Sequence, residues 1–132
     1  IILGAGVIAL EMAQSFSLLG SQVTVVNRSS RLFQSKGGDQ EAAEILQKEL
    51  EKDGVIFLSS AKATKVETMV QGRSGEFPLM KVTIDGVDQE CECLLVATGR
   101  AANVENLGLE AAGVDFKIGA GITVNDFSQS VS

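Results

Sequence analysis

The chain has 132 residues with 17 acidic and 11 basic side chains, which gives a formal net charge of −6. It contains no histidine, tryptophan or tyrosine, so neither a Ser-His-Asp triad nor a Cys-His pair can be built from this chain alone. The acidity disfavours nucleic acid and anionic membranes as partners, and no apolar run approaches the roughly 20 residues of a membrane span.

The first 26 residues predict a strand, a glycine turn, a helix and a second strand, which together form a βαβ unit. The apolar run at 1–3 and the β-branched run at 23–26 are typical of buried parallel strands. The helix is predicted over 7–19 and ends before Gly20, a residue type that often follows a helix. Its apolar residues recur at helical spacing on one face: Ile8, Met12, Phe16 and Leu19.

A second helix is predicted over 40–52, with Asp39 as its N-cap, and a third strand over 55–58. The alternation of apolar and polar residues at 66–70 and 80–84 is then typical of half-exposed antiparallel strands. Glycine-containing segments at 72–75 and 85–86 predict the turns of this small sheet.

The last third of the chain returns to a buried strand at 94–97, followed by a short helix at 104–112 and a strand at 121–124. No linker or repeat interrupts these elements, so residues 1–132 are predicted to form one domain. The predicted fold class is α/β: a Rossmann-like doubly wound parallel sheet with an inserted three-stranded antiparallel β-meander.

The turn after the first strand matches the pattern Gly-x-Gly-x-x-Gly/Ala through Gly4, Gly6 and Ala9, with Val7 and Ile8 between them. Gly4 allows a tight turn, Gly6 lets the backbone approach a pyrophosphate, and Ala9 lets the helix pack closely on the strand. The helix N-terminus then directs its N–H groups and its positive dipole end at the phosphates. We interpret the motif as a dinucleotide-binding turn, although an S-adenosylmethionine-binding methyltransferase also has a glycine-rich first turn.

The loop after the second strand bears on which nucleotide is bound. An NAD site usually has Asp or Glu at this strand end to hold the ribose 2′-hydroxyl, and this chain has Asn27. Arg28 and Arg31 follow, and arginine binds a 2′-phosphate through charge-assisted hydrogen bonds. Ser29 and Ser30 add hydroxyl donors. NADP is therefore predicted as the cofactor, with NAD as the second choice.

Cys91 and Cys93 are the two cysteines of the chain, and in a strand they would point the same way. We interpret them as buried small hydrophobic residues, because a metal site needs more ligands than two and the chain has no histidine. No metal is predicted.

With these motifs, the sequence resembles the NAD(P)-binding domain of the pyridine nucleotide-disulfide oxidoreductases, which include mercuric reductase, dihydrolipoamide dehydrogenase and glutathione reductase. The resemblance rests on Gly-Ala-Gly-Val-Ile-Ala-Leu-Glu-Met-Ala at 4–13, Leu-Gly-Ser-Gln-Val-Thr-Val-Val at 19–26 and Leu-Leu-Val-Ala-Thr-Gly-Arg at 94–100. The mercuric reductases look nearest, with a similar Gly-Ser-Gln-Val-Thr-Val stretch. An inserted β-meander is also how this domain looks in the family.

The resemblance implies roles for single residues. Glu11 matches the glutamate that lies near the flavin and pairs with a lysine of the flavin domain. Gly99, which follows Thr98 in the Ala-Thr-Gly-Arg motif, matches a glycine that lets the nicotinamide half approach. Val7 stands where glutathione reductases have a tyrosine gate, and Arg28 matches a 2′-phosphate arginine of the NADPH-using members. The candidate cofactor-binding residues are Gly4, Gly6, Val7, Ile8, Ala9, Glu11, Asn27, Arg28, Ser29, Arg31, Thr98 and Gly99.

The resemblance also implies that the reactive groups lie elsewhere, with a redox cysteine pair in a preceding flavin domain and a histidine in a following dimerisation domain. We therefore expect a fragment, inactive alone, of a homodimeric FAD-dependent enzyme that passes hydride from NADPH to the flavin. The start within a core strand, without Met, points the same way. A non-catalytic NAD(P)-sensing module is the alternative, and the final electron acceptor stays open. The two sparse cysteines suggest a reducing compartment, either cytoplasm or an organelle.

Overall fold

The computed structural model describes residues 1–33, 38–71 and 77–130. Contacts within the chain divide it into two compact units, Ile1–Thr98 and Gly99–Ser132. None of the helices in the described ranges is long and apolar enough to cross a membrane.

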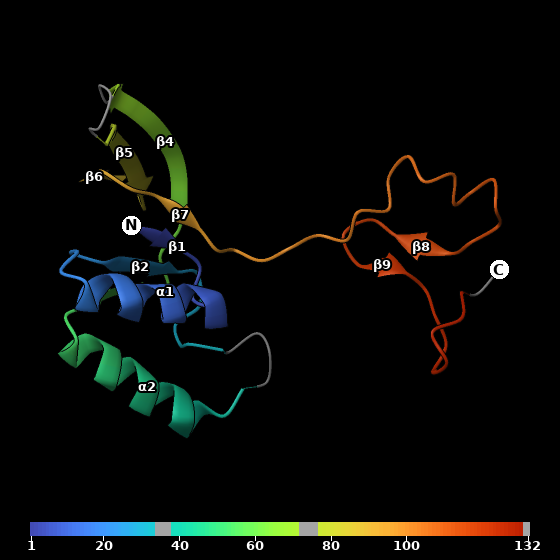
Figure 1. Ribbon diagram of the computed structural model, residues 1–132, viewed down its shortest axis with the longest axis horizontal. Helices are drawn as coiled ribbons and strands as arrows, with labels where there is room; N and C mark the ends of the chain where they lie inside the picture. Colours follow the sequence, from blue (N-terminus) through green and yellow to red (C-terminus); the bar gives the residue numbers. More distant parts are fainter. Residues whose placement is uncertain (34–37, 72–76, 131–132) are drawn as a thin grey trace. The chain divides into compact units, whose positions relative to one another are not determined.

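A four-stranded parallel sheet forms the centre of the first unit (Figure 1). Its strands are β1 (Ile2–Leu3), β2 (Thr24–Asn27), β3 (Ile56–Ser59) and β7 (Leu95–Val96), in the order β3-β2-β1-β7. All three pairings are parallel, and β1 pairs with both β2 and β7. The carboxyl ends of β1, β2 and β7 therefore lie at one edge of the sheet, where ligands of open α/β sheets bind.

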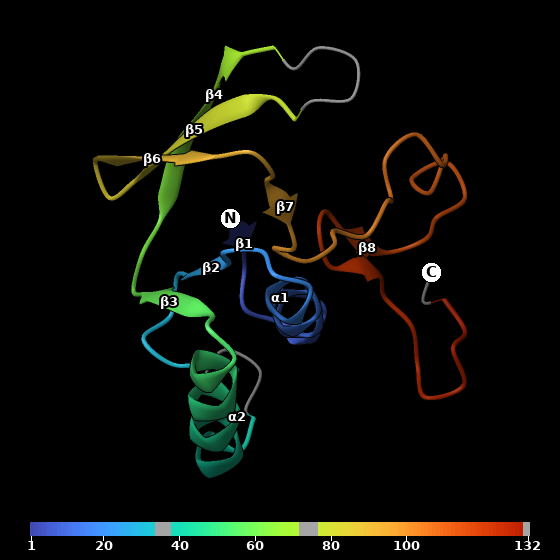
Figure 2. The same cartoon turned by 60° about the vertical axis from the view of Figure 1, so that its left-hand side comes forward.

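The two faces of this sheet are covered by different layers (Figures 1 and 2). Helices α1 (Val7–Leu18) and α2 (Gln40–Lys52) cover one face, and their buried residues pack with Ile2 and Val25. The other face carries an antiparallel sheet, and Val26 packs there with Val82 and Ile84. Because successive residues of a strand point to opposite faces, β2 contributes to both cores.

The antiparallel sheet is the predicted three-stranded meander and consists of β4 (Ala63–Val70), β5 (Leu79–Ile84) and β6 (Val87–Cys91). Asp85 and Gly86 join β5 to β6 with φ angles of 49° and 82°. Positive φ at both positions is typical of a type I′ hairpin turn, which confirms the turn predicted at these residues. The predicted turn at 72–75 lies outside the described residues. The α/β fold class with its inserted meander is confirmed.

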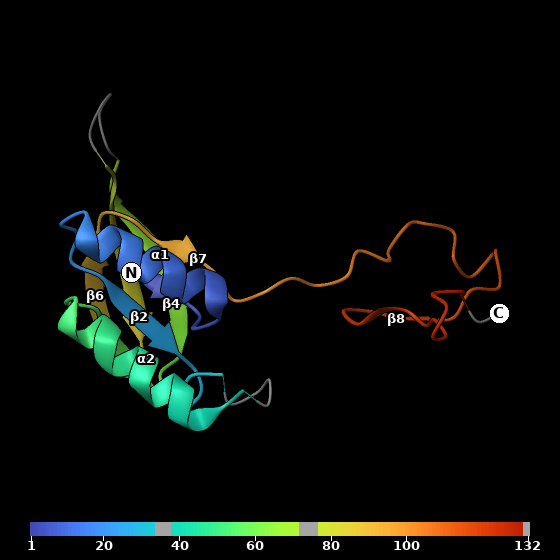
Figure 3. The same cartoon turned by 60° about the horizontal axis from the view of Figure 1, so that its bottom comes forward.

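Helix α1 buries a different face from the predicted one. Its buried residues are Ala9, Leu10 and Ala13, whereas Ile8 is 67% and Leu19 82% exposed. The alanines are fully buried because the helix lies close to the sheet (Figure 3), where a larger side chain would separate the two layers. Of the predicted face, Met12 packs partly buried against the core, but Ile8, Phe16 and Leu19 are exposed, so the prediction is wrong for these three residues.

The predicted helix boundaries agree better with the structure. The carboxylate of Asp39 accepts a hydrogen bond from the N–H of Ala42 at 3.1 Å, which confirms the N-cap of α2. Gly20 follows α1 with φ 95°, and its N–H donates to the carbonyl of Ser17 while that of Ser21 donates to Phe16. This pair of hydrogen bonds is a Schellman motif, which satisfies the last carbonyls of the helix.

The second unit contains a short hairpin of β8 (Phe116–Lys117) and β9 (Gly121–Ile122). The predicted helix at 104–112 is wrong, because only hydrogen-bonded turns occur there, the last closed by Gly113 at φ 69°. The predicted strand at 121–124 ends after two residues, and Val124 forms an isolated bridge with Ser130. A unit with many glycines at positive φ cannot continue regular helices or strands for long.

Candidate dinucleotide-binding site

Gly4 is required by the fold itself. It has φ 104°, and its N–H donates to the carbonyl of Val26 at 3.0 Å. A Cβ at this position would overlap the carbonyl oxygen of Ala97 and lie 3.2 Å from the Cα of Thr98. The turn thus passes directly against the chain that leaves β7, and it brings Gly4 and Thr98 together at the carboxyl edge of the sheet.

Gly6, in contrast, is required by neither its backbone nor its neighbours. It is the N-cap of α1 with φ −82° and ψ 178°, a conformation open to any residue. A Cβ there would meet no atom of the chain's described part within 4 Å. The absence of a side chain leaves open space directly in front of the helix N-terminus.

Among the described residues, no group of the protein occupies the N-terminus of α1. The first helical hydrogen bond is donated by Leu10 to the carbonyl of Gly6 at 3.1 Å, so the N–H groups of Val7, Ile8 and Ala9 have no partner within the helix. Within the described ranges no side chain caps this end, and the first turn has no acidic residue. Free N–H groups, the positive dipole end and open space together fit a phosphate group.

The loop after β2 is built around the side chain of Asn27, which is 8% exposed. Its Oδ1 accepts from the N–H of Ser29 and its Nδ2 donates to the carbonyl of Arg31, both at 3.1 Å. The sequence predicts Asn27 as a cofactor-binding residue, and the structure adds that its carboxamide holds its own loop.

Arg28 and Arg31 are exposed, and neither forms an ion pair with a carboxylate among the residues that the structure describes. Ser29 is half-buried, and its carbonyl accepts from the N–H of Ser60 at 3.0 Å, just after β3. The loop therefore presents two uncompensated guanidinium groups at the same sheet edge as the glycine turn.

The remaining candidates are less closely connected. Glu11 lies on α1, one turn beyond the glycine turn, with an exposed side chain. Thr98 ends the first unit, and Gly99 begins the second with φ 112° and with open space where a Cβ would stand. The site that the structure assembles is thus the glycine turn, the loop after β2 and Thr98.

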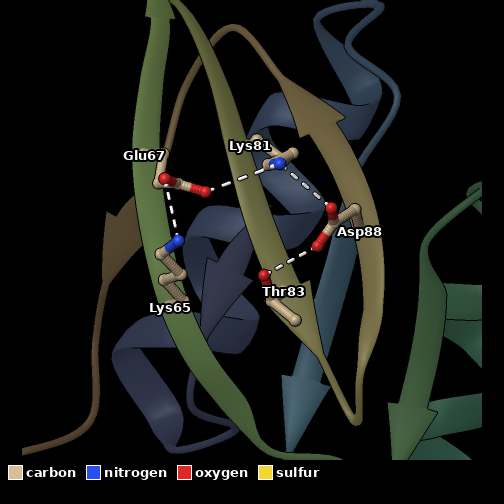
Figure 4. Close-up of polar contacts among 5 residues, drawn as sticks. All are labelled: Lys65, Glu67, Lys81, Thr83 and Asp88. Carbon is tan, nitrogen blue, oxygen red and sulfur yellow. Dashed lines mark hydrogen bonds and ion pairs between the residues drawn. The ribbon is translucent and has the colours of Figure 1, made fainter.

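An ion-pair cluster on the meander was not predicted from the sequence (Figure 4). This charge ladder consists of Lys65, Glu67, Lys81, Thr83 and Asp88. Lys81 reaches Asp88 at 3.0 Å and Glu67 at 3.5 Å, across three neighbouring strands. Antiparallel pairing places these residues together, a long-range relation that a single sequence does not display.

The charge ladder shifts the pKa values of its own members. Hydrogen bonding to Lys65 lowers the pKa of Glu67, and hydrogen bonding to Thr83 and Lys81 lowers that of Asp88. The pKa of Lys81 is raised, mainly by its hydrogen bond to Asp88 and by the attraction of that carboxylate. Since all of these groups are solvated, we interpret the ladder as a structural feature of the exposed sheet face.

The two cysteines differ from each other. Cys91 ends β6 half-buried against the second core cluster, and burial raises the pKa of its thiol. Cys93 is exposed, so the prediction that both are buried is wrong for this residue. The strand ends at Cys91, and strand alternation does not extend beyond it. The described residues include no group of three or more metal-ligating side chains.

The chain is similar to known proteins over nearly its whole length. The family described as pyridine nucleotide-disulphide oxidoreductase matches residues 1–131. A mercuric reductase of Lysinibacillus sphaericus is 38% identical over 98% of this chain, and a glutathione reductase of Nostoc sp. is 33% identical over 98%. The solved structure of a HOCl-induced flavoprotein disulfide reductase, RclA, from Escherichia coli has the same fold, with a TM-score of 0.82 and 24% identity over 99% of this chain.

The match covers only part of each relative. The chain corresponds to 23% of the mercuric reductase, 29% of the glutathione reductase and 28% of the flavoprotein disulfide reductase. These relatives are oxidoreductases, which favours that class over the methyltransferase alternative.

Proposed function

Because the chain belongs to the pyridine nucleotide-disulphide oxidoreductase family, we propose that residues 1–132 form the NADPH-binding domain of a longer FAD-dependent oxidoreductase. The observation that carries the proposal is the open, uncapped N-terminus of α1 at Gly6. It lies at the same sheet edge as a loop with two arginines that form no ion pair with any residue the structure describes.

The pyrophosphate of the nucleotide is assigned to the glycine turn. The N–H groups of Val7, Ile8 and Ala9 supply donors without partners in the helix, and Gly6 leaves room for the phosphate oxygens. Gly4 contributes indirectly, because its turn sets the position from which α1 begins. Within the described residues, neither the backbone conformation of Gly6 nor a neighbouring atom requires a glycine there, which supports the assignment of a ligand to this space.

The preference for NADPH rests on charge. Arg28 and Arg31 stand at the end of β2, where a carboxylate would repel a 2′-phosphate. Neither has an ion-pair partner within the ranges that the structure describes, so a phosphate would not displace an existing contact. Ser29 offers a further hydroxyl in the same loop.

The nicotinamide side is proposed from the family resemblance. Glu11, Thr98 and Gly99 are assigned to this side, and Val7 provides no aromatic gate. When bound, NADPH supplies the hydride that the flavin of the longer protein accepts. A flavin domain, a dimerisation domain and a second copy in a homodimer are proposed as partners, with the final electron acceptor left open.

The test is Arg28→Glu in the polypeptide that carries this chain, titrated calorimetrically with NADP⁺ and NAD⁺. We expect the NADP⁺ affinity to fall at least about tenfold relative to the NAD⁺ affinity, because a charge-assisted phosphate contact becomes a repulsion. Lys48→Glu makes the same charge change on the exposed surface of α2 and should leave the ratio unchanged.

Three results would speak against parts of the proposal. An unchanged affinity ratio in Arg28→Glu removes the NADPH assignment. A wild-type protein that binds neither nucleotide removes the nucleotide-binding function altogether. Nucleotide binding without reduction of the flavin in the longer protein would favour the non-catalytic sensing module.

A further inference from the structure

Asn27 is the only buried polar residue in the described part of the chain. An asparagine side chain offers both an acceptor and a donor, and the structure uses both within four residues. Oδ1 accepts from the N–H of Ser29, and Nδ2 donates to the carbonyl of Arg31. The backbone from 28 to 31 therefore wraps around one carboxamide.

The same loop is also held from β3. Ser60, with φ 56°, donates its N–H to the carbonyl of Ser29 at 3.0 Å, and Ala61 donates to the carbonyl of Asn27 at 2.9 Å. These two hydrogen bonds continue the pairing of β2 with β3 beyond the strand ends. The loop backbone is thus fixed on two sides, while the side chains of Arg28 and Arg31 remain exposed.

We propose that Asn27 is a positioning residue for selectivity toward the 2′-phosphate: its carboxamide fixes the loop backbone so that Arg28 presents its guanidinium group, and it does so without contacting the nucleotide. This inference rests on the proposed NADPH-binding function. A loop ordered before binding loses less conformational entropy on binding, so the effect concerns affinity for the phosphate that the loop contacts.

The chemistry of Asn is specific for this role. An aspartate in its place would keep the acceptor for Ser29 but set a carboxylate oxygen against the carbonyl of Arg31. An alanine would remove both hydrogen bonds and introduce no charge. The two variants therefore separate loss of loop order from electrostatic repulsion of the ligand.

The experiment uses the polypeptide that carries this chain and two probes, 2′,5′-ADP and 5′-AMP, in calorimetric titrations. We expect Asn27→Ala to lower the affinity for 2′,5′-ADP roughly fivefold to tenfold, because two hydrogen bonds are lost. The affinity for 5′-AMP should fall less than about twofold. Asn27→Asp should reduce the preference for 2′,5′-ADP over 5′-AMP further. As a matched control, Asn125→Ala removes a similar asparagine turn in the other unit, where Oδ1 accepts from Phe127 and Gln129.

A double-mutant cycle tests whether Asn27 acts through Arg28. In an Arg28→Ala background, Asn27→Ala should no longer change the ratio of the two affinities. If the affinity ratio still changes in the Arg28→Ala background, or if Asn27→Ala lowers the affinity for both probes equally, Asn27 has only a structural role and the inference is overturned. Should Asn27→Ala not fold, the same criteria apply to Asn27→Leu, which has a similar size, adds no charge and makes neither hydrogen bond.

Failure of the proposed function gives a different pattern. If the wild-type protein shows no preference for 2′,5′-ADP over 5′-AMP, the NADPH assignment itself is wrong. If the preference is present and depends on Arg28 but not on Asn27, only the positioning role is refuted.

Discussion

The substitution Gly6→Asp tests whether Gly6 is required for ligand binding or for folding. The N-cap conformation of φ −82° and ψ 178° suits aspartate, and the surrounding space is open. Asp is a better N-cap than Gly by a few tenths of a kcal/mol. Replacing glycine also lowers the conformational entropy of the unfolded chain, which stabilises the folded state by about 0.4–1 kcal/mol more. We therefore expect α1 to be stabilised locally by about 0.5–1.5 kcal/mol.

The same substitution should weaken nucleotide binding. The new carboxylate would accept hydrogen bonds from the free N–H groups in the first turn of α1. It would also place a negative charge where the pyrophosphate is assigned. We expect the affinity for NADP⁺ to fall at least about tenfold, which corresponds to roughly 1.4 kcal/mol. Gly6→Ser, which caps without a charge, should show the same signs with a smaller loss of affinity.

Hydrogen exchange of the α1 amides measures the first effect, and calorimetric titration with NADP⁺ measures the second. Asp39→Ala is the matched control, because it removes the N-cap of α2, lowers local stability by about 1 kcal/mol and should leave NADP⁺ binding unchanged. The reasoning is refuted if Gly6→Asp binds NADP⁺ as tightly as the wild type, or if α1 is destabilised.

Three further outcomes follow from the geometry. Gly4→Ala should destabilise the first unit by about 2–5 kcal/mol, because φ 104° and the adjacent backbone exclude a Cβ. Limited proteolysis measures this, and a cleavage rate no higher than that of the wild type would contradict it. The carboxyl pKa values of the charge ladder lie below their ordinary values of 4.5 and 3.8, so their stabilisation is present above these values and lost as the pH falls through the folded pKa values. Lys81→Met should flatten this acid limb of a stability–pH profile, and an unaltered profile would count against it. Alkylation followed by mass spectrometry should label Cys93 before Cys91, whose thiol is half-buried with a raised pKa; the reverse order would refute the assignment.

Local sequence patterns were sufficient for most of the first unit. Continuous apolar runs located the parallel strands, and Gly20 and Asp39 located helix ends within a residue. The buried face of α1 could not be found in this way, because the pattern of large apolar residues marks Ile8 and Leu19. Close packing on the sheet selects small residues instead, and that constraint arises only when the two layers meet.

The sequence predicts which residues form the candidate site and a role for each glycine, but not the contacts that surround them in the structure. The glycine pattern does not say that the carbonyl of Ala97 excludes a Cβ at Gly4 while Gly6 faces open space. Similarly, the composition of the loop after β2 does not reveal that Asn27 turns its carboxamide toward Ser29 and Arg31. Each of these facts depends on contacts between segments or on loop conformation, which a single sequence does not encode in a readable pattern.

The contact between Gly4 and Ala97 has a consequence for how this chain tolerates mutation. The atom that a new Cβ would meet is a main-chain carbonyl oxygen, which every residue type at position 97 would retain. No second-site substitution at 97 can therefore act as a suppressor of a change at position 4. In a selection for folded protein alone, position 4 should accept only glycine, whereas position 6 should accept many residues until nucleotide binding is also selected.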